Sequence, residues 1–262
     1  MTIRHFIDHK QNGEKLTLTT CYDYWSAKLL SSCPVDALLI GDSAAMVMHG
    51  HPTTLPASLD MMAWHTAAVT RGAPEQFLIS DVPFLGARRG LAHAMEHVET
   101  LMRAGAHAVK IEGERGHGDI IAHIVESGIP VMGHLGVTPQ SVHGLGGYRP
   151  RGVSTSEIAT LVEEARGLEN AGCFAVVLEC VPAETARQIT GALDIPTIGI
   201  GAGPHVDGQV LVLHDLLGFN PGFHPKFVRA FADGARLFQE AVTAFDRAVK
   251  EGTFPDASET YS

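Results

Sequence analysis

One short apolar stretch carries two opposite charges at alternate positions: Ala108-Val109-Lys110-Ile111-Glu112-Gly113. Because side chains alternate across a β-strand, Lys110 and Glu112 share one face of the expected strand, and Val109 and Ile111 take the other. A short buried strand therefore delivers an ammonium and a carboxylate to one place.

Four further apolar runs also end at an ionisable residue. Ala37–Gly41 is followed by Asp42 and Ser43, Phe77–Ser80 by Asp81, Pro130–Gly133 by His134, and Phe174–Leu178 by Glu179. If these runs are neighbouring parallel strands, their carboxyl ends meet at one edge of the sheet and bring these ionisable residues together in one acidic site, which we call the mouth. Metal binding and proton transfer are expected there.

Strand-like and helix-like segments alternate along the 262 residues. The remaining strands are expected at Lys15–Tyr22, Pro196–Ile200 and Gln209–His214. Helices are expected at Ser58–Arg71, Leu91–Ala104, Asp119–Ser127, Ser154–Asn170, Ala183–Leu193 and Lys226–Lys250. Eight strands with intervening helices over about 250 residues predict a (β/α)₈ TIM barrel; the alternative, a doubly wound open sheet, usually has fewer strands. No linker-like composition divides the chain, so one domain over residues 1–262 is expected.

Charge and composition limit the partners. The chain has 29 acidic and 19 basic residues and a formal charge of −10, which disfavours nucleic acids and anionic membranes as ligands. No apolar run approaches the roughly 20 residues of a membrane span, and the start of the chain does not resemble a secretory signal. The four cysteines lack zinc-site spacing, so a reduced, cytoplasmic protein that binds small molecules is expected.

Three carboxylates of the expected mouth suit a hard cation. Asp42, Asp81 and Glu112 offer oxygen ligands of the kind that Mg²⁺ prefers. Each has a structural alternative, since Asp81 could begin a turn and Asp42 could cap a following segment. Their recurrence at matching strand ends favours the joint functional interpretation.

The other mouth residues point to proton transfer. Lys110 could form an ion pair inside the barrel, stabilise an enolate oxygen or form a Schiff base. Glu179 follows a strand on the opposite side from the three carboxylates, which favours a general base over a fourth metal ligand. His134 is either a hydrogen-bonded core histidine or a member of the mouth.

Two long connections leave the same face, at Ser43–Pro56 and Leu135–Val153. The second is rich in glycine, so we expect a mobile lid, with a surface excursion as the alternative. The run Gly199-Ile200-Gly201-Ala202-Gly203 could cradle a phosphate or allow a substrate to approach the backbone closely. Asp23 is expected to cap a helix.

Several motifs together resemble the ketopantoate hydroxymethyltransferase family over nearly the whole chain, in order. They include Asp81-Val82-Pro83-Phe84, Val109-Lys110-Ile111-Glu112-Gly113, Gly133-His134-Leu135-Gly136 with Thr138-Pro139-Gln140, Leu178-Glu179-Cys180-Val181-Pro182, and Gly199-Ile200-Gly201-Ala202-Gly203 with Asp207-Gly208-Gln209. The resemblance implies a barrel of the phosphoenolpyruvate/pyruvate superfamily. It also implies transfer of a hydroxymethyl group from 5,10-methylenetetrahydrofolate to 3-methyl-2-oxobutanoate, which gives 2-dehydropantoate for pantothenate and coenzyme A synthesis.

The resemblance also implies roles for individual residues. It places Asp42, Asp81 and Glu112 at the Mg²⁺ site, directly or through water, and Asp42, Ser43, Asp81 and Lys110 at the keto-acid site. Glu179 matches the general base and His134 a residue of the catalytic pocket. A homo-oligomer, a decamer of two stacked pentamers, is expected.

A few positions depart from the family pattern, and these concern the folate pocket and the loop after the third strand. They are Ala44-Ala45, Trp64, Gly86-Ala87-Arg88 and Arg151. Three other interpretations stay open. A carbon–carbon lyase of the same superfamily commonly carries a Lys-Lys-Cys-Gly-His loop, which this sequence lacks; a Schiff-base aldolase would use Lys110; a noncatalytic barrel would bind Mg²⁺ without turnover.

Overall fold

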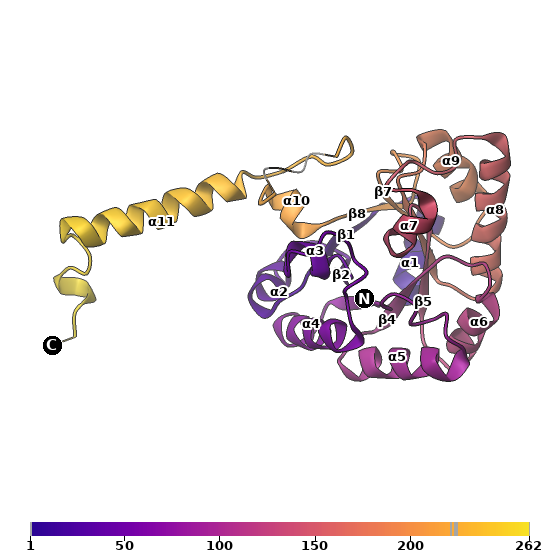
Figure 1. Ribbon diagram of the computed structural model, residues 1–262, viewed down its shortest axis with the longest axis horizontal. Coiled ribbons are helices and arrows are strands. Elements are labelled where there is room, and N and C mark those ends of the chain that lie inside the picture. The colour runs from indigo at the N-terminus through magenta and orange to yellow at the C-terminus, as the bar shows by residue number, and fades with distance from the viewer. Residues whose placement is uncertain (1, 221, 223–224, 262) are drawn as a thin grey trace. The chain divides into compact units, whose positions relative to one another are not determined.

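The computed structural model describes residues 2–220, 222 and 225–261. Within them, eight parallel strands close into a barrel in chain order, which confirms the predicted (β/α)₈ fold (Figure 1). The strands are β1 (Leu16–Thr20), β2 (Ala37–Ile40), β3 (Phe77–Asp81), β4 (Ala108–Glu112), β5 (Val131–Gly136), β6 (Ala175–Glu179), β7 (Thr197–Ile200) and β8 (Gly208–Leu211).

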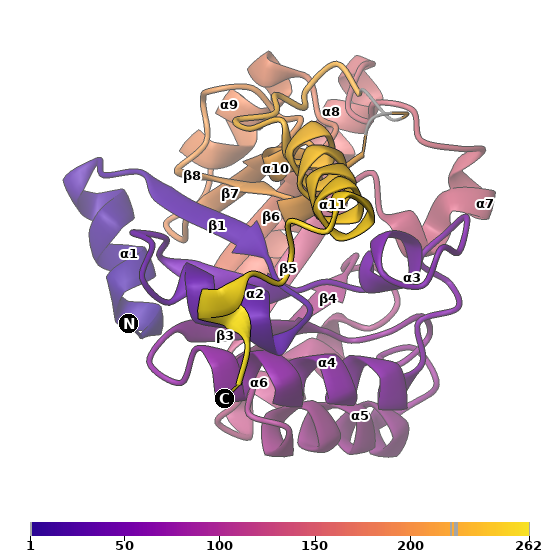
Figure 2. The ribbon, with the colours of Figure 1, turned by 90° about the vertical axis from the view of Figure 1, so that its left-hand side faces the viewer.

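Helices follow most of the strands, and those from α1 to α9 lie around the barrel (Figure 2). They are α1 (Ile3–Asn12), α2 (Tyr24–Leu30), α3 (Ala44–Val47), α4 (Leu59–Gly72), α5 (Leu91–Arg103), α6 (Gly118–Glu126), α7 (Val142–Leu145), α8 (Thr155–Asn170), α9 (Ala183–Gly191), α10 (Leu213–Leu217) and α11 (Gly234–Glu251). Helices α4, α5, α6 and α8 pack directly against strands β2 to β6. No helix of the described chain is long and apolar enough to cross a membrane.

The chain divides into two compact units, Met1–Val212 and Leu213–Ser262. The first contains the barrel, and the second contains α10 and α11. One domain over residues 1–262 therefore stays a prediction.

Two predicted boundaries near the C-terminus are wrong. The last strand ends at Leu211, so that His214 lies in α10, and the last helix begins at Gly234 rather than at Lys226. Backbone hydrogen bonds explain the second difference, because Phe231 N donates to Leu216 O and Ala235 N donates to Gly218 O. Phe231, which the predicted helix included, therefore bonds to α10, and the first turn of α11 bonds to the residue that follows α10.

The barrel interior is apolar at the amino ends of the strands. Phe6 of α1 is fully buried, with its ring centroid 5.7 Å from that of Phe77 and 5.1 Å from that of Phe174. The inward side chains of the strands pack around it: Leu16, Leu18, Ala37, Leu39, Ile79, Ala108, Met132, Ala175, Val177, Ile198 and Val210. Val109 and Ile111 belong instead to the core between barrel and helices, so the predicted alternation of β4 is confirmed.

The register of the parallel strands decides which polar residues become neighbours. Asp81 pairs with Lys110, Glu112 with His134, and Gly136 with Glu179. Gly136 has a φ of +97°, and a Cβ atom there would collide with the backbone oxygen of Glu179. A glycine is therefore needed where β5 passes closest to Glu179.

We expect Gly136→Ala to destabilise the protein by about 2 kcal/mol, because it adds both backbone strain and a clash. Gly144→Ala is the matched control, since a Cβ at that position of α7 meets nothing within 4 Å. Urea unfolding followed by circular dichroism measures both variants. Equal stability of Gly136→Ala and wild type would show that β6 shifts without cost.

Candidate active site

A buried ion pair lies at the carboxyl ends of β3 and β4. Lys110 Nζ is 2.9 Å from Asp81 Oδ1, and their side chains are 5% and 3% exposed. The backbone N–H of Asp42, just after β2, donates to Asp81 Oδ2 at 3.0 Å. The ion pair proposed for Lys110 from the sequence is therefore present, and it joins three neighbouring strands.

The charge state of Lys110 follows from its surroundings. Burial opposes the ammonium form, but the charges of Asp81, Glu112 and Asp42 outweigh burial and raise the pKa of Lys110 above its ordinary value. A protonated amine is not a nucleophile, so this environment favours charge stabilisation over Schiff-base formation.

His134 on β5 connects two glutamates. Its Nδ1 is 3.5 Å from Glu112 Oε1 and its Nε2 is 3.3 Å from Glu179 Oε2. The same Nδ1 lies 3.3 Å from Lys110 Nζ. Burial and Lys110 oppose a charge on the imidazole, but Glu112 and Glu179 raise the pKa of His134 to about 9. His134 therefore lies within the mouth rather than in an apolar core.

Asp42 and Glu112 are bridged by Gln140, from the connection after β5. Gln140 Nε2 donates to Asp42 Oδ2 at 2.8 Å, and its backbone N–H donates to Glu112 Oε2 at 3.0 Å. Burial, followed by the charges of Asp81 and Glu112, raises the pKa of Asp42 well above its ordinary value. The carboxylates are thus close enough to destabilise one another's charge.

Ser43 lies beside this group. Its Oγ is 2.8 Å from the hydroxyl of Tyr22, which follows β1. A Cβ built on Gly41 would contact both Ser43 Oγ and Asp81 Oδ2. The structure therefore brings together all seven residues predicted for the mouth: Asp42, Ser43, Asp81, Lys110, Glu112, His134 and Glu179.

The charge of the mouth fits a divalent cation. Its four carboxylates face Lys110 and His134, which leaves a formal charge of −2 even when His134 is protonated. Glu112 Oε1 is buried, and its contact with His134 Nδ1, at 3.5 Å, is long for a hydrogen bond. A buried acceptor of this kind suits a cation or its bound water.

The carboxylates do not form a closed metal cage. Within residues 2–220, 222 and 225–261, no three His, Cys, Asp or Glu side chains are grouped as ligands of one metal ion. Mg²⁺ usually keeps several waters and takes only one or two carboxylates directly. The residues present therefore fit Mg²⁺ held partly through water.

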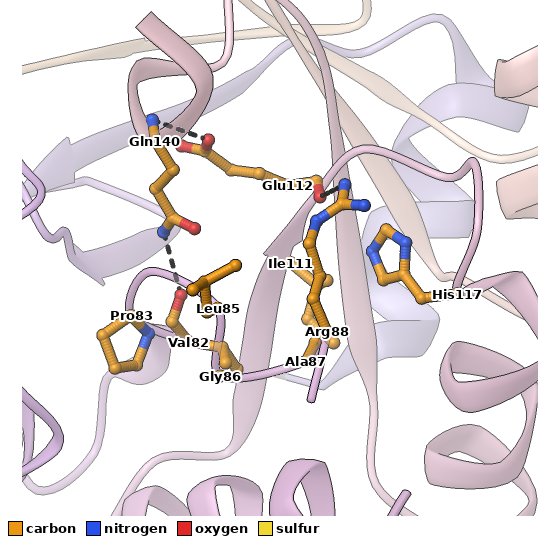
Figure 3. Close-up of a pocket in the computed structure, with 10 residues that line it drawn as sticks. All are labelled: Val82, Pro83, Leu85, Gly86, Ala87, Arg88, Ile111, Glu112, His117 and Gln140. Atoms are coloured by element: carbon orange, nitrogen blue, oxygen red, sulfur yellow. Dashed lines mark hydrogen bonds between the residues drawn. The ribbon is translucent and has the colours of Figure 1, made fainter. Parts of the chain in front are cut away.

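A small hollow adjoins Glu112 on the side of the connection after β3 (Figure 3). Arg88, Leu85 and His117 are among its lining residues. Arg88 donates through Nη2 to the backbone oxygen of Glu112 and through Nη1 to that of Arg115, both at 3.1 Å. Arg88, a departure from the family pattern, thus holds the end of β4 in place.

Sequence reasoning missed the roles of Tyr22 and Gln140 in this arrangement. Gln140 appeared in the sequence only as part of the motif Thr138-Pro139-Gln140, and no periodicity singled out Tyr22.

Two further predictions concern residues outside the mouth. Asp23 is confirmed as a helix cap, because it accepts a hydrogen bond from Ser26 N at 2.9 Å. Gly203 packs against Ala183 so closely that a Cβ would lie 2.5 Å from that side chain, which explains one glycine of its run without a ligand.

The connection after β5, predicted as a lid, contains a 3₁₀ turn at Pro139–Ser141 and the short helix α7. Val137 N, at its start, donates to Glu179 O at 2.8 Å. The connection is therefore tied to the mouth at Val137 and at Gln140.

Solved structures of low sequence identity share the barrel. A phosphoenolpyruvate phosphomutase from Streptomyces platensis superposes with a TM-score of 0.65 at 11% identity, covering 96% of this chain and 88% of that one. A 2,3-dimethylmalate lyase of the PEP mutase/isocitrate lyase superfamily gives 0.63 at 18% identity, covering 98% of this chain and 87% of that one. These likenesses concern the fold alone.

Relatives in sequence are much closer. A 3-methyl-2-oxobutanoate hydroxymethyltransferase of Bdellovibrio bacteriovorus is 51% identical over 261 residues, which is 100% of this chain and 99% of that protein. One from Coxiella burnetii is 53% identical over 247 residues, covering 94% of this chain and 93% of that protein. The family model for ketopantoate hydroxymethyltransferase matches residues 1–257. The chain therefore belongs to the ketopantoate hydroxymethyltransferase family.

Proposed function

We propose that the mouth transfers a hydroxymethyl group from 5,10-methylenetetrahydrofolate to 3-methyl-2-oxobutanoate through an enolate, with Mg²⁺ as the cation. Membership of the family makes the chain a hydroxymethyltransferase that forms 2-dehydropantoate on the route to pantothenate. The observation that carries the mechanism is the row of contacts that runs from Asp81 through Lys110 and His134 to Glu179.

Asp42, Asp81 and Glu112 would hold the cation, in part through water. When bound, Mg²⁺ would polarise the keto and carboxylate oxygens of the substrate and so acidify the proton on its β-carbon. Lys110 keeps its positive charge because three carboxylates surround it, and it stabilises negative charge on the enolate oxygen. Ser43, held by Tyr22, offers a hydroxyl for the keto acid.

Glu179 is suited to remove the β-proton. Its side chain is 19% exposed, whereas those of Asp81, Lys110, Glu112 and His134 are 5% exposed or less. It can therefore reach a substrate that rests on the buried residues. His134 Nε2, 3.3 Å from Glu179 Oε2, orients this carboxylate.

The environment of Lys110 and the comparisons with relatives weigh against two of the alternative functions, the Schiff-base aldolase and the carbon–carbon lyase. The raised pKa of Lys110 disfavours the Schiff-base aldolase. The solved 2,3-dimethylmalate lyase shares only the fold, at 18% identity, whereas the relatives that are 51% and 53% identical over nearly the whole chain are hydroxymethyltransferases.

Resemblance to the family also supports a homo-oligomer, a decamer. The four unpaired cysteines support a cytoplasmic location.

We expect Glu179→Gln to lower exchange of the β-proton of 3-methyl-2-oxobutanoate by roughly 10²–10⁴-fold, because the base is lost. Keto-acid binding should stay near that of wild type. Tritium release measured without folate follows this half-reaction alone. Glu184→Gln, on the exposed face of α9, is the matched control and should exchange at the wild-type rate. Rapid exchange in Glu179→Gln would assign the base to another residue.

Lys110→Ala should slow both β-proton exchange and overall transfer by about 10²–10³-fold, since one fixed charge that stabilises the enolate is removed. Treatment of wild type with borohydride and keto acid, followed by mass spectrometry, should leave Lys110 unmodified. A reduced adduct on Lys110 would favour the aldolase mechanism instead.

Asp81→Asn should weaken Mg²⁺ binding about tenfold or more, because it removes a charged oxygen from the mouth. Calorimetric titration measures this. Asp207→Asn is the control, since it also breaks an ion pair, with Lys10 at 2.9 Å, but one that lies before β8 at the other end of the barrel. Equal Mg²⁺ affinity in Asp81→Asn and Asp207→Asn would remove Asp81 from the cation site.

A further inference from the structure

We propose that Gln140 is a positioning residue that couples the connection after β5 to the carboxylates of the mouth, so that this connection and the cation site become ordered together. The proposal rests on the function proposed above and adds a residue to it. Gln140 contacts no predicted reacting atom; it acts through Asp42 and Glu112.

Three hydrogen bonds carry the proposal. Gln140 Nε2 donates to Asp42 Oδ2 at 2.8 Å and to Val82 O at 3.0 Å, while its backbone N–H donates to Glu112 Oε2 at 3.0 Å. Figure 3 shows the bonds to Val82 and Glu112. Both side-chain partners are acceptors, so the amide nitrogen must face them and the orientation of the amide is settled by chemistry.

The three acceptors come from three different strands. Asp42 follows β2, Val82 follows β3 and Glu112 ends β4, whereas Gln140 lies on the 3₁₀ turn after β5. The turn itself is closed by Ser141 N donating to Thr138 O at 2.8 Å. One residue of a long connection thus links four neighbouring strands, β2 to β5, across half of the barrel rim.

The chemistry of an amide suits this task. A lysine or arginine at position 140 would neutralise charge that the cation needs, and a glutamate would add a fifth carboxylate to the mouth. A neutral donor holds Oδ2 of Asp42 and leaves its Oδ1 for another ligand. Gln140 therefore orients carboxylates without competing with a metal ion.

The connection is anchored at a second point beside the base. Val137 N donates to the backbone oxygen of Glu179 at 2.8 Å, three residues before Gln140. Movement of residues 137–140 would therefore disturb Glu179 at one end and Asp42 and Glu112 at the other. Loss of the Gln140 side chain should consequently affect both the loop and the metal.

Gln140→Met tests the coupling, because methionine has a similar length, keeps the backbone N–H and removes both side-chain donors. Gln140→Glu is a second variant, which keeps the shape of the side chain. Ser141→Ala is the matched control on the same turn, with an exposed side chain. We measure hydrogen–deuterium exchange of residues 138–148 in metal-free protein, Mg²⁺ affinity with 3-methyl-2-oxobutanoate present, and kcat and KM for β-proton exchange.

We expect both Gln140 variants to exchange amide hydrogens faster over residues 138–148, and Gln140→Met to bind Mg²⁺ roughly 10- to 100-fold more weakly, as for loss of a hydrogen bond to a charged group. The kcat should fall more than the KM rises, because the substrate still has Lys110. Ser141→Ala should match wild type in all three measurements.

Loop exchange in Gln140→Met equal to that of Ser141→Ala would overturn the proposal, and so would unchanged Mg²⁺ affinity despite a loosened loop. A merely structural role would lower the unfolding midpoint and leave the kcat of the folded protein unchanged, which also contradicts it. Failure of the proposed function can be distinguished from failure of this proposal. In the first case wild type would release no tritium from the keto acid, while amide hydrogen exchange of residues 138–148 in metal-free protein would still report on Gln140.

Discussion

The structure depends on a buried ammonium. Lys110 lies inside the barrel, where an uncompensated charge would be very unfavourable. Asp81 compensates it directly, and Asp42 and Glu112 add further negative charge around it. Burial, together with the neighbouring charges of Asp81 and Glu112, disfavours the charged form of Asp42 and raises its pKa. The proposed cation would relieve this repulsion between the carboxylates.

The barrel makes this arrangement tolerable by separating apolar and polar layers. Phe6 and the inward side chains around it fill the lower interior, so the polar residues are confined to the upper layers and to the rim. Parallel register then places acid beside base, as in the pairs Asp81 with Lys110 and Glu112 with His134. A shift of one residue would turn either strand's charges toward the apolar helix layer.

The connections complete what the strands begin. Gln140 crosses from the connection after β5 to Asp42 and Glu112, Arg88 holds the end of β4, and Tyr22 holds Ser43. None of these side chains carries out proton transfer in the proposed reaction. They fix the positions of Ser43, Asp42 and Glu112, the groups proposed to hold the substrate and the cation, where rigid supporting contacts matter most.

Much of this protein was readable from its sequence. Alternation in Ala108–Glu112 placed Lys110 and Glu112 on one face, and five apolar runs with charged ends predicted both the barrel and the set of residues at its mouth. Periodicity works here because buried parallel strands are short, apolar and regularly spaced. The predicted end of the last strand and the predicted start of the last helix were wrong. For the helix, a backbone hydrogen bond from Phe231 to α10 outweighs local helix propensity.

Tertiary structure alone decided which partner each charge has. The sequence left Lys110 with three possible roles, and only its distance to Asp81 and the charges around it favour one of them. Gln140 lies 98 residues from Asp42 along the chain, so no local pattern could connect them. Sequence periodicity specifies which face a side chain occupies, whereas contacts between distant segments depend on strand register and on the paths of the connections, which are set only when the whole barrel closes.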